Sequence, residues 1–177
     1  MWIHRTRGLL TVAAAGILTV AFAAPASAVG TSATVTIMGG ALSISAPTSA
    51  GNLGSRANTV LAGTISGPLG QVQVEDARGA AAGSGWVASV ISTAFTPSAG
   101  PTIGAAAVGY TAGPITKIGT ATFTANDPPD LTGDVAAVTA TGITGDNSAT
   151  WTPTIHVRVA GGKAAGVYSA TITHSVA

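Results

Sequence analysis

The sequence predicts an all-β protein, and three observations support this prediction. Beyond residue 30, polar and apolar residues alternate in one segment after another, as in strands with one buried and one solvated face. Glycine, proline and asparagine turn signals separate these segments. No segment beyond residue 28 has the apolar spacing of an amphipathic helix. Together they predict a single antiparallel β-sandwich, immunoglobulin-like, that follows a cleaved signal peptide.

The clearest strand patterns lie near the C-terminus. From residue 151 to 159 the odd-numbered positions are apolar and the even-numbered positions are Thr, His or Arg. After a break at Gly161-Gly162-Lys163, one face is shared by Tyr168, Ala170, Ile172, His174 and Val176. Further strands are expected at residues 33–37, 42–45, 58–66, 71–75, 86–92, 108–110, 120–124 and 135–140, with residues 76–85 as a Gly- and Ala-rich loop.

Residues 1–28 have the three parts of a secretory signal. A short basic start is followed by an uncharged apolar run over residues 9–24, and the small-residue triplet Ala26-Ser27-Ala28 follows Pro25. The apolar run is shorter than the roughly 20 residues that span a bilayer, which argues against a transmembrane anchor. We expect cleavage after Ala28, leaving residues 29–177 as one domain that is secreted and lies outside the cell or in the cell wall.

The expected mature domain has no obvious means of covalent attachment. The chain has no cysteine, which excludes disulfides, thiolate metal sites and lipid attached to a cysteine. We expect no stable membrane anchor after signal cleavage, so any retention at the cell surface is noncovalent. Without Arg5 and Arg7, five basic and six acidic residues remain, a net charge of about −1. That balance lacks the basic surface expected of a nucleic-acid-binding protein.

No set of residues in the sequence forms a convincing catalytic centre. The motif Gly-x-Ser-x-Gly is missing, and the mature chain offers only two histidines as bases. Glu75 and Asp76 are adjacent, so on a strand they point to opposite faces and do not flank one glycosidic bond. We therefore expect a protein that is not an enzyme and that needs no cofactor.

Metal binding has weak candidates in the sequence. Asp127, Asp130, Asp134 and Asp146 lie in turns rich in Pro and Gly, where such residues commonly form turns, and their spacing differs from an EF-hand. No metal site is expected, although calcium binding by these turns stays an open alternative. His174, on an otherwise apolar face, is expected at the edge of the core with a backbone hydrogen bond; a ligand-binding or pH-sensing role is the alternative.

Two segments carry a resemblance to a known family. The stretch Gly83-Ser84-Gly85-Trp86-Val87-Ala88-Ser89-Val90 and the C-terminal residues 166–176 resemble the WxL-domain proteins, which are secreted surface proteins of Gram-positive bacteria. Trp86 matches the first tryptophan of that family, and Tyr168, Ile172 and Thr173 match its distal motif. The chain departs from the family pattern at three positions, where the family has Leu, Trp and Leu and this chain has Ala88, His174 and Val176.

The resemblance implies a non-enzymatic cell-envelope protein that attaches noncovalently to peptidoglycan or to another surface protein, as a binding or structural module. An alternative is a subunit of an extracellular assembly that docks by adding a β-strand, with its oligomeric state open. The motif positions Trp86, Ala88, Tyr168, Ile172, Thr173 and His174 either contact the ligand or pack in the core. Core packing is the expectation for Trp86 and Tyr168, because each is in phase with aliphatic residues.

The cleavage site is the first testable point. The intact mass of the secreted protein is expected to correspond to a chain that begins at Val29, because Ala26 and Ala28 supply the small residues that signal peptidase requires. Mass spectrometry of the protein recovered from the culture and the envelope measures this. A mass that retains residues 1–28 contradicts the prediction and indicates an uncleaved anchor.

Overall fold

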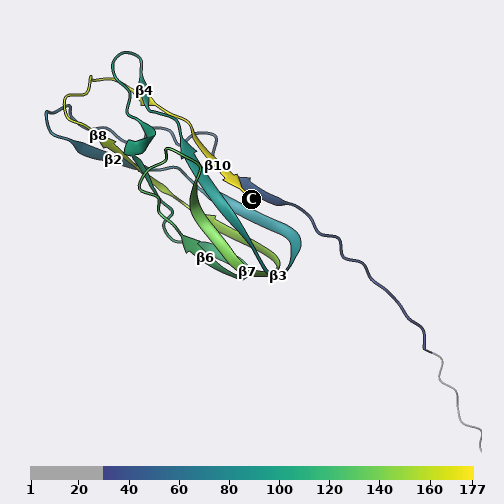
Figure 1. Ribbon diagram of the computed structural model, residues 1–177. Helices are drawn as coiled ribbons and strands as arrows, with labels where there is room; N and C mark the ends of the chain where they lie inside the picture. The colour runs from purple at the N-terminus through teal and green to yellow at the C-terminus, as the bar shows by residue number, and fades with distance from the viewer. Residues whose placement is uncertain (1–29) are drawn as a thin grey trace, which may run out of the picture. The chain divides into compact units, whose positions relative to one another are not determined.

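The computed structural model describes residues 30–177, and the predicted signal peptide lies outside the described residues. A compact unit formed by residues 37–177 contains all the strands of the described chain (Figure 1). No helix in this described part is long and apolar enough to cross a membrane. Its only helical segment is a single 3-10 turn at Ala105–Ala107.

The strands form three antiparallel sheets. The largest has the order β1-β3-β7-β6, with β10 also paired to β3; these strands are Leu42–Ser45 (β1), Val72–Ser92 (β3), Val135–Trp151 (β7), Thr116–Ala125 (β6) and Ile172–Val176 (β10). The second has the order β2-β8-β5, from Gly63–Pro68 (β2), Thr154–Val159 (β8) and Val108–Thr111 (β5). The third pairs Thr96–Pro97 (β4) with Tyr168–Ser169 (β9).

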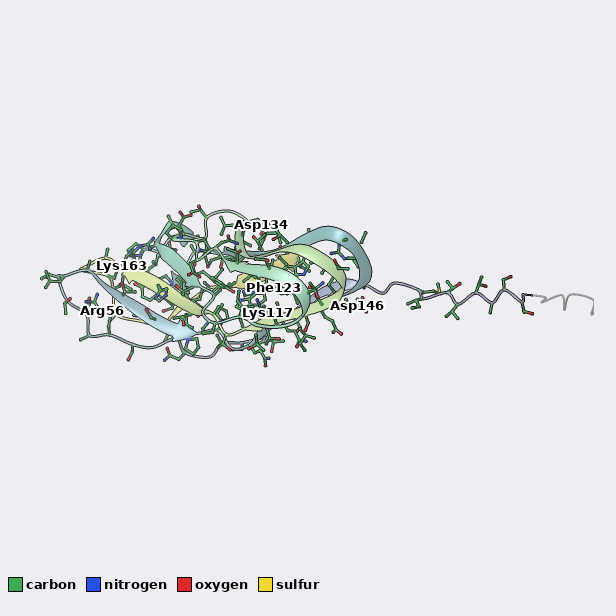
Figure 2. All side chains as sticks on the ribbon, turned by 90° about the horizontal axis from the view of Figure 1, so that it is seen from below. Arg56, Lys117, Phe123, Asp134, Asp146 and Lys163 are labelled. Atoms are coloured by element: carbon green, nitrogen blue, oxygen red, sulfur yellow. The ribbon has the colours of Figure 1, made fainter. Side chains whose placement is uncertain are left out.

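The two longest strands bend in their middle. From Asp76 to Trp86, β3 advances ten positions while its partner β7 advances only seven, from Asn147 to Ala140. The surplus residues of β3 form bulges, where Gly79 and Gly83 adopt positive φ angles of 63° and 88° that other residues rarely adopt. Bulges bend a strand and increase its twist. Figures 1 and 2 show the ribbons of β3 and β7 turning over together at this point.

The second sheet continues the first half of the bent sheet. Each strand of the second sheet is joined to a strand of the largest sheet by only two to four residues: β2 to β3, β8 to β7 and β5 to β6. The order β2-β8-β5 therefore matches the order β3-β7-β6. Prolines at positions 68 and 153 lie at this junction, where each removes a backbone donor from the ladder. The Leu69 N–H donates to the Pro153 carbonyl over 2.9 Å, which pairs the β2–β3 connection with the β7–β8 connection.

The hydrophobic core lies between the packed sheets, and this confirms the predicted all-β sandwich. Val72 and Val74 come from the first half of β3, and Trp86, Ala88 and Val90 from the second half. All five are buried, as the alternation of the sequence predicts. The whole core cluster and the residues packed against it lie between residues 42 and 176.

A chain of hydrogen bonds fixes the bend. Arg78 donates from Nε and Nη2 to the two carboxylate oxygens of Asp76, over 2.8 and 3.0 Å. Asn147 Nδ2 donates to Asp76 Oδ2 over 3.0 Å, and Trp86 Nε1 donates to Asn147 Oδ1 over 2.9 Å. Asp76, Asn147 and Trp86 are buried. The hydrogen bonds from the Arg78 side chain hold the pKa of Asp76 below its usual range, so the buried carboxylate stays charged.

Several expected strand boundaries are wrong. The pattern at residues 151–159 is divided between the end of β7 at Trp151 and β8, the pattern at 168–176 is divided between β9 and β10, and the strand expected at 135–140 continues to Trp151. Residues 76–85 are not a loop but the bulged centre of β3, because its glycines relax the backbone within the strand pairing. Asp76 is therefore a buried member of a strand, and Glu75 is exposed on the opposite face, as the sequence predicts. Residues 33–37 form no strand, since no neighbouring strand in the described chain pairs with them. The strand expected at 58–66 begins only at Gly63.

Trp86 offers a test of the core. The predicted burial of this residue is confirmed, with 2% of its surface exposed and its ring 5.7 Å from that of Phe123. Trp86→Ala is expected to lower the free energy of unfolding by about 3–5 kcal/mol, as large core truncations do. Trp86→Phe is expected to cost about 1–3 kcal/mol or more, because it leaves the buried Asn147 oxygen without its donor. Urea unfolding measures both changes.

The matched control is the neighbouring residue on the other face of β3. Val87 is exposed, so Val87→Ala is expected to change the unfolding free energy by less than about 1 kcal/mol. Equal urea midpoints for Trp86→Ala and Val87→Ala would show that Trp86 is not a core residue.

Candidate functional site

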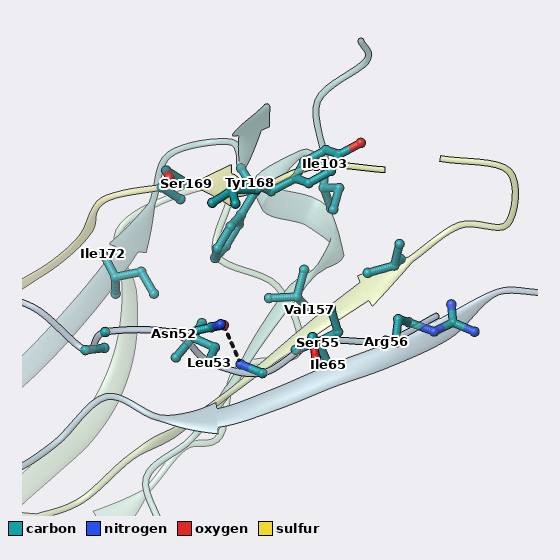
Figure 3. Close-up of a pocket in the computed structure, with 18 of the residues that line it drawn as sticks. Asn52, Leu53, Ser55, Arg56, Ile65, Ile103, Val157, Tyr168, Ser169 and Ile172 are labelled. Carbon is teal, nitrogen blue, oxygen red and sulfur yellow. Dashed lines mark hydrogen bonds between the residues drawn. The ribbon is translucent and has the colours of Figure 1, made fainter. Parts of the chain in front are cut away.

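A groove with a volume of about 760 Å³ opens between two segments of the described chain. One wall is the irregular segment 46–59, and the other is the segment 163–171 (Figure 3). The volume falls in the range of ordinary ligand sites, about 300–1,000 Å³. Its apolar floor is formed by side chains from β2, β3 and β8 and from connecting segments: Ile65, Leu69, Val72, Phe95, Ile103 and Val157.

The first wall lies close against β2 because of a glycine. A Cβ atom at Gly67 would lie 2.4 Å from the carbonyl oxygen of Leu53, so any larger residue would push the wall away. Farther along, Asn52 Oδ1 accepts a hydrogen bond of 2.9 Å from the Gly54 N–H, shown as the dashed line in Figure 3. This side-chain-to-backbone turn gives the wall its local shape without any regular secondary structure.

The groove residues carry positive but no negative charge. Arg56 and Lys163 line it, and no Asp or Glu does. Lys163 Nζ donates to the Thr102 carbonyl over 2.6 Å, and both Arg56 Nη atoms lie 3.4 Å from the Leu61 carbonyl. Figure 2 shows both cations at the end of the sandwich away from Asp146. Exposed amides and hydroxyls supply further polar atoms of the walls: Thr48, Ser49, Asn52, Ser55, Asn58, Thr59, Ser169 and Thr171.

The distal motif of the sequence lies in the second wall. Tyr168, on β9, is half-buried beside the groove, and its hydroxyl donates to the Ala164 carbonyl over 2.9 Å. Ile172 and His174 on β10 are half-buried groove residues, whereas Thr173 between them is exposed on the opposite face. Tyr168 is therefore less buried than the sequence pattern predicts.

The early motif lies in the core and not in the groove. Trp86 and Ala88 are buried on β3. Their strand is hydrogen-bonded to β10, where Val176 pairs with Ala88 and His174 with Val90. The two motif segments, about eighty residues apart in the sequence, are thus neighbouring strands. Trp86 and Ala88 hold this arrangement from inside, while Tyr168, Ile172 and His174 face the groove.

His174 has a side-chain partner, and the expected backbone hydrogen bond is wrong. Its Nε2 lies 3.3 Å from the Tyr110 hydroxyl, which accepts a hydrogen bond of 2.7 Å from Trp151 Nε1. Tyr110 and Trp151 are buried, so this Trp151–Tyr110–His174 contact chain runs from the core to the groove. Burial lowers the pKa of His174 below its usual value and raises the pKa of Tyr110 above its usual range. At neutral pH the His174 imidazole and the Tyr110 hydroxyl are therefore both uncharged.

Three of the four acidic turn residues and the second histidine have structural partners. Asp127 accepts from the Ala112 N–H over 2.8 Å, Asp146 from the Gly79 N–H over 2.9 Å, and Asp130 from Thr132. His156 lies between two hydroxyls, 2.9 Å from Ser66 Oγ and 3.1 Å from Thr111 Oγ1. Among residues 30–177, no three His, Asp or Glu side chains gather as they would around a metal ion.

The groove walls are the part of the site that the sequence pattern does not reveal. Residues 46–59 have neither alternation nor a recognisable motif, and only their place between two strands marks them as a connection. Their relation to the distal motif arises from tertiary packing. Comparison of the chain with protein-family models, with curated proteins and with solved structures finds no match.

The pKa of His174 leads to a testable pH dependence. Its folded pKa is lower than its unfolded value of about 6.5, so the unfolded chain takes up the proton first. Stability from the neutral imidazole is therefore complete above about pH 6.5 and decreases as the pH falls below it. The melting temperature is expected to fall between about pH 7 and about pH 5.

Two variants identify the residue responsible for this effect. His174→Gln is expected to flatten the decrease in melting temperature, because a glutamine takes up no proton in this range. His156→Gln is the control and is expected to keep the decrease. If His174→Gln retains the full dependence, the buried imidazole is not its source.

Proposed function

We propose that this chain is an exported, non-enzymatic binding module that associates noncovalently with the cell wall, and that the groove between residues 46–59 and 163–171 is its ligand site. The observation that supports this most is the composition of the groove. An apolar floor, walls rich in hydroxyls and amides, and two cations without an acid form a site for a polar ligand with apolar faces. The predicted signal peptide supports export.

Peptidoglycan has the chemistry that such a groove suits. Its sugar rings have apolar faces that pack on aromatic and aliphatic side chains, and Tyr168 and the apolar floor offer such surfaces. Its hydroxyls and amides pair with groups such as Asn52 and Ser55. The carboxylates of its peptides favour the side of the groove that holds Arg56 and Lys163, because charge-assisted hydrogen bonds to carboxylates are the stronger ones.

The same residues favour binding over catalysis. Hydrolysis by acid–base chemistry usually needs a carboxylate or a free imidazole beside the scissile bond. Among the groove residues no carboxylate is present, and the one imidazole, that of His174, is near the Tyr110 hydroxyl. Retention without chemical change is therefore the function that we propose.

Filling the groove tests the proposal. Ser55 is an exposed wall residue, and Ser55→Trp is expected to occupy the groove with an indole. The variant is expected to bind washed cell walls at least about tenfold more weakly, which corresponds to a loss of about 1.4 kcal/mol. Cosedimentation of the purified domain with walls over a range of wall concentrations measures the apparent affinity.

Thr173→Trp is the matched control. It adds the same side chain on the exposed face of β10 that is turned away from the groove, and wall binding is expected to remain. Melting temperatures of both variants establish that each is folded. Equal binding by Ser55→Trp and the unchanged protein contradicts the groove as the site. If the unchanged protein stays wholly in the supernatant, wall association itself is excluded.

A further inference from the structure

Residues 31–38 have the sequence of a strand but no partner in the described chain. Thr34 and Thr36 alternate with Val35 and Ile37 in an uncharged segment. Val35 and Ile37 are 91% and 92% exposed, and Met38 is 88% exposed. Single exposed apolar residues are common, but three within four positions of an alternating segment are characteristic of a surface that becomes covered. A strand is stable only beside another strand or sheet.

The β6 edge is the longest strand edge that the described chain leaves open. β6 has ten residues and pairs only with β7. The edge of β2 lies against residues 53 and 56, and on the edge of β5 the Tyr110 N–H donates to the Pro128 carbonyl. β1 and β10 are only four and five residues long. An open edge of this length is a template for a further strand.

We propose that residues 31–38 of one copy of this protein add as a strand to the β6 edge of a second copy. The side-chain patterns of the two strands match. On β6, Ala121 and Phe123 are half-buried against the core, whereas Thr120, Thr122 and Thr124 are exposed. Val35 and Ile37 have the same two-residue spacing and would extend the apolar face beside Phe123. Thr34 and Thr36 would then join the threonine row, where cross-strand Thr pairs are favourable.

The length of the chain excludes pairing of this segment with β6 of the same copy. Gly40 N–H is bonded to the Ala77 carbonyl beside β1, which lies at the opposite edge of the order β1-β3-β7-β6. Counted along the sheet, the position beyond β6 is four strand spacings from β1, roughly 19 Å. Met38 and Gly39 span at most about 7 Å. A second copy must therefore supply the edge, and the head-to-tail contact allows further copies to add.

Charge substitutions in the donor segment test this interface. The purified chain of residues 29–177 is expected to form dimers and larger species as its concentration rises, measured by size-exclusion chromatography with light scattering. The double variant Val35→Asp, Ile37→Asp is expected to stay monomeric, because it places two charges on the face that would be buried. The control Val60→Asp, Leu61→Asp changes two equally apolar exposed residues elsewhere and is expected to associate like the unchanged protein.

Cross-linking tests which edge receives the segment. Because the chain has no cysteine, a Thr36→Cys protein mixed with a Thr120→Cys, Thr122→Cys or Thr124→Cys protein has only the introduced thiols. A mixed disulfide dimer is expected for at least one of the three, since directly opposed Cβ atoms come within bonding range. Thr64→Cys, on β2, is the control and is expected to give none.

The outcomes separate this interface from the groove. A chain that stays monomeric at every concentration, or a Val35→Asp, Ile37→Asp variant that associates as before, overturns the proposal. Cross-linking of Thr36→Cys to Thr64→Cys but not to any β6 position also overturns it. Wall binding in the Ser55→Trp experiment is measured independently, so either proposal can fail while the other stands.

Discussion

The buried carboxylate of Asp76 is the constraint on which the rest of the structure depends. Removing a charge from water is expensive, and a buried ion that loses its partner is strongly destabilising. The bend of the largest sheet brings Arg78 and Asn147 to this carboxylate, and Asn147 in turn accepts from Trp86. The network is satisfied only when the two halves of β3 and β7 face each other. One polar chain therefore specifies the bend, and the bend forms the sandwich.

The same bend places the segment that contains Trp86 in the core and the segment that contains Tyr168 beside the groove. Trp86 lies just beyond the bulges and points into the core. Pairing of β10 with this half of β3 then sets the path of the preceding residues, so that Tyr168 and His174 face the groove. Ala88 and Val176 are paired across neighbouring strands, and His174 has a polar partner in Tyr110.

A surface with few charges affects how this protein recognises other molecules. Only 7% of the residues are charged, and the groove walls present mainly hydroxyl, amide and backbone groups. Such groups form hydrogen bonds whose strength depends on geometry and local shape, whereas exposed ion pairs are weakened by salt. In the contact between copies that we propose, the uncharged segment at residues 31–38 and the threonine row of β6 would extend the same chemistry. Backbone pairing requires no charge complementarity.

The sequence by itself determined the fold class, the strands with clear alternation and the burial of Trp86. The reason is that alternation of apolar and polar residues indicates which side chains of a strand are buried. It did not show that residues 76–85 continue β3, since Gly-rich bulges and Gly-rich loops have the same composition. It also placed a strand at residues 33–37, where the pattern exists but no neighbouring strand pairs with it. The Tyr110–His174 contact and the groove were decided only by tertiary structure. Both join residues more than sixty positions apart, whose proximity depends on the bend and on strand order, not on local pattern.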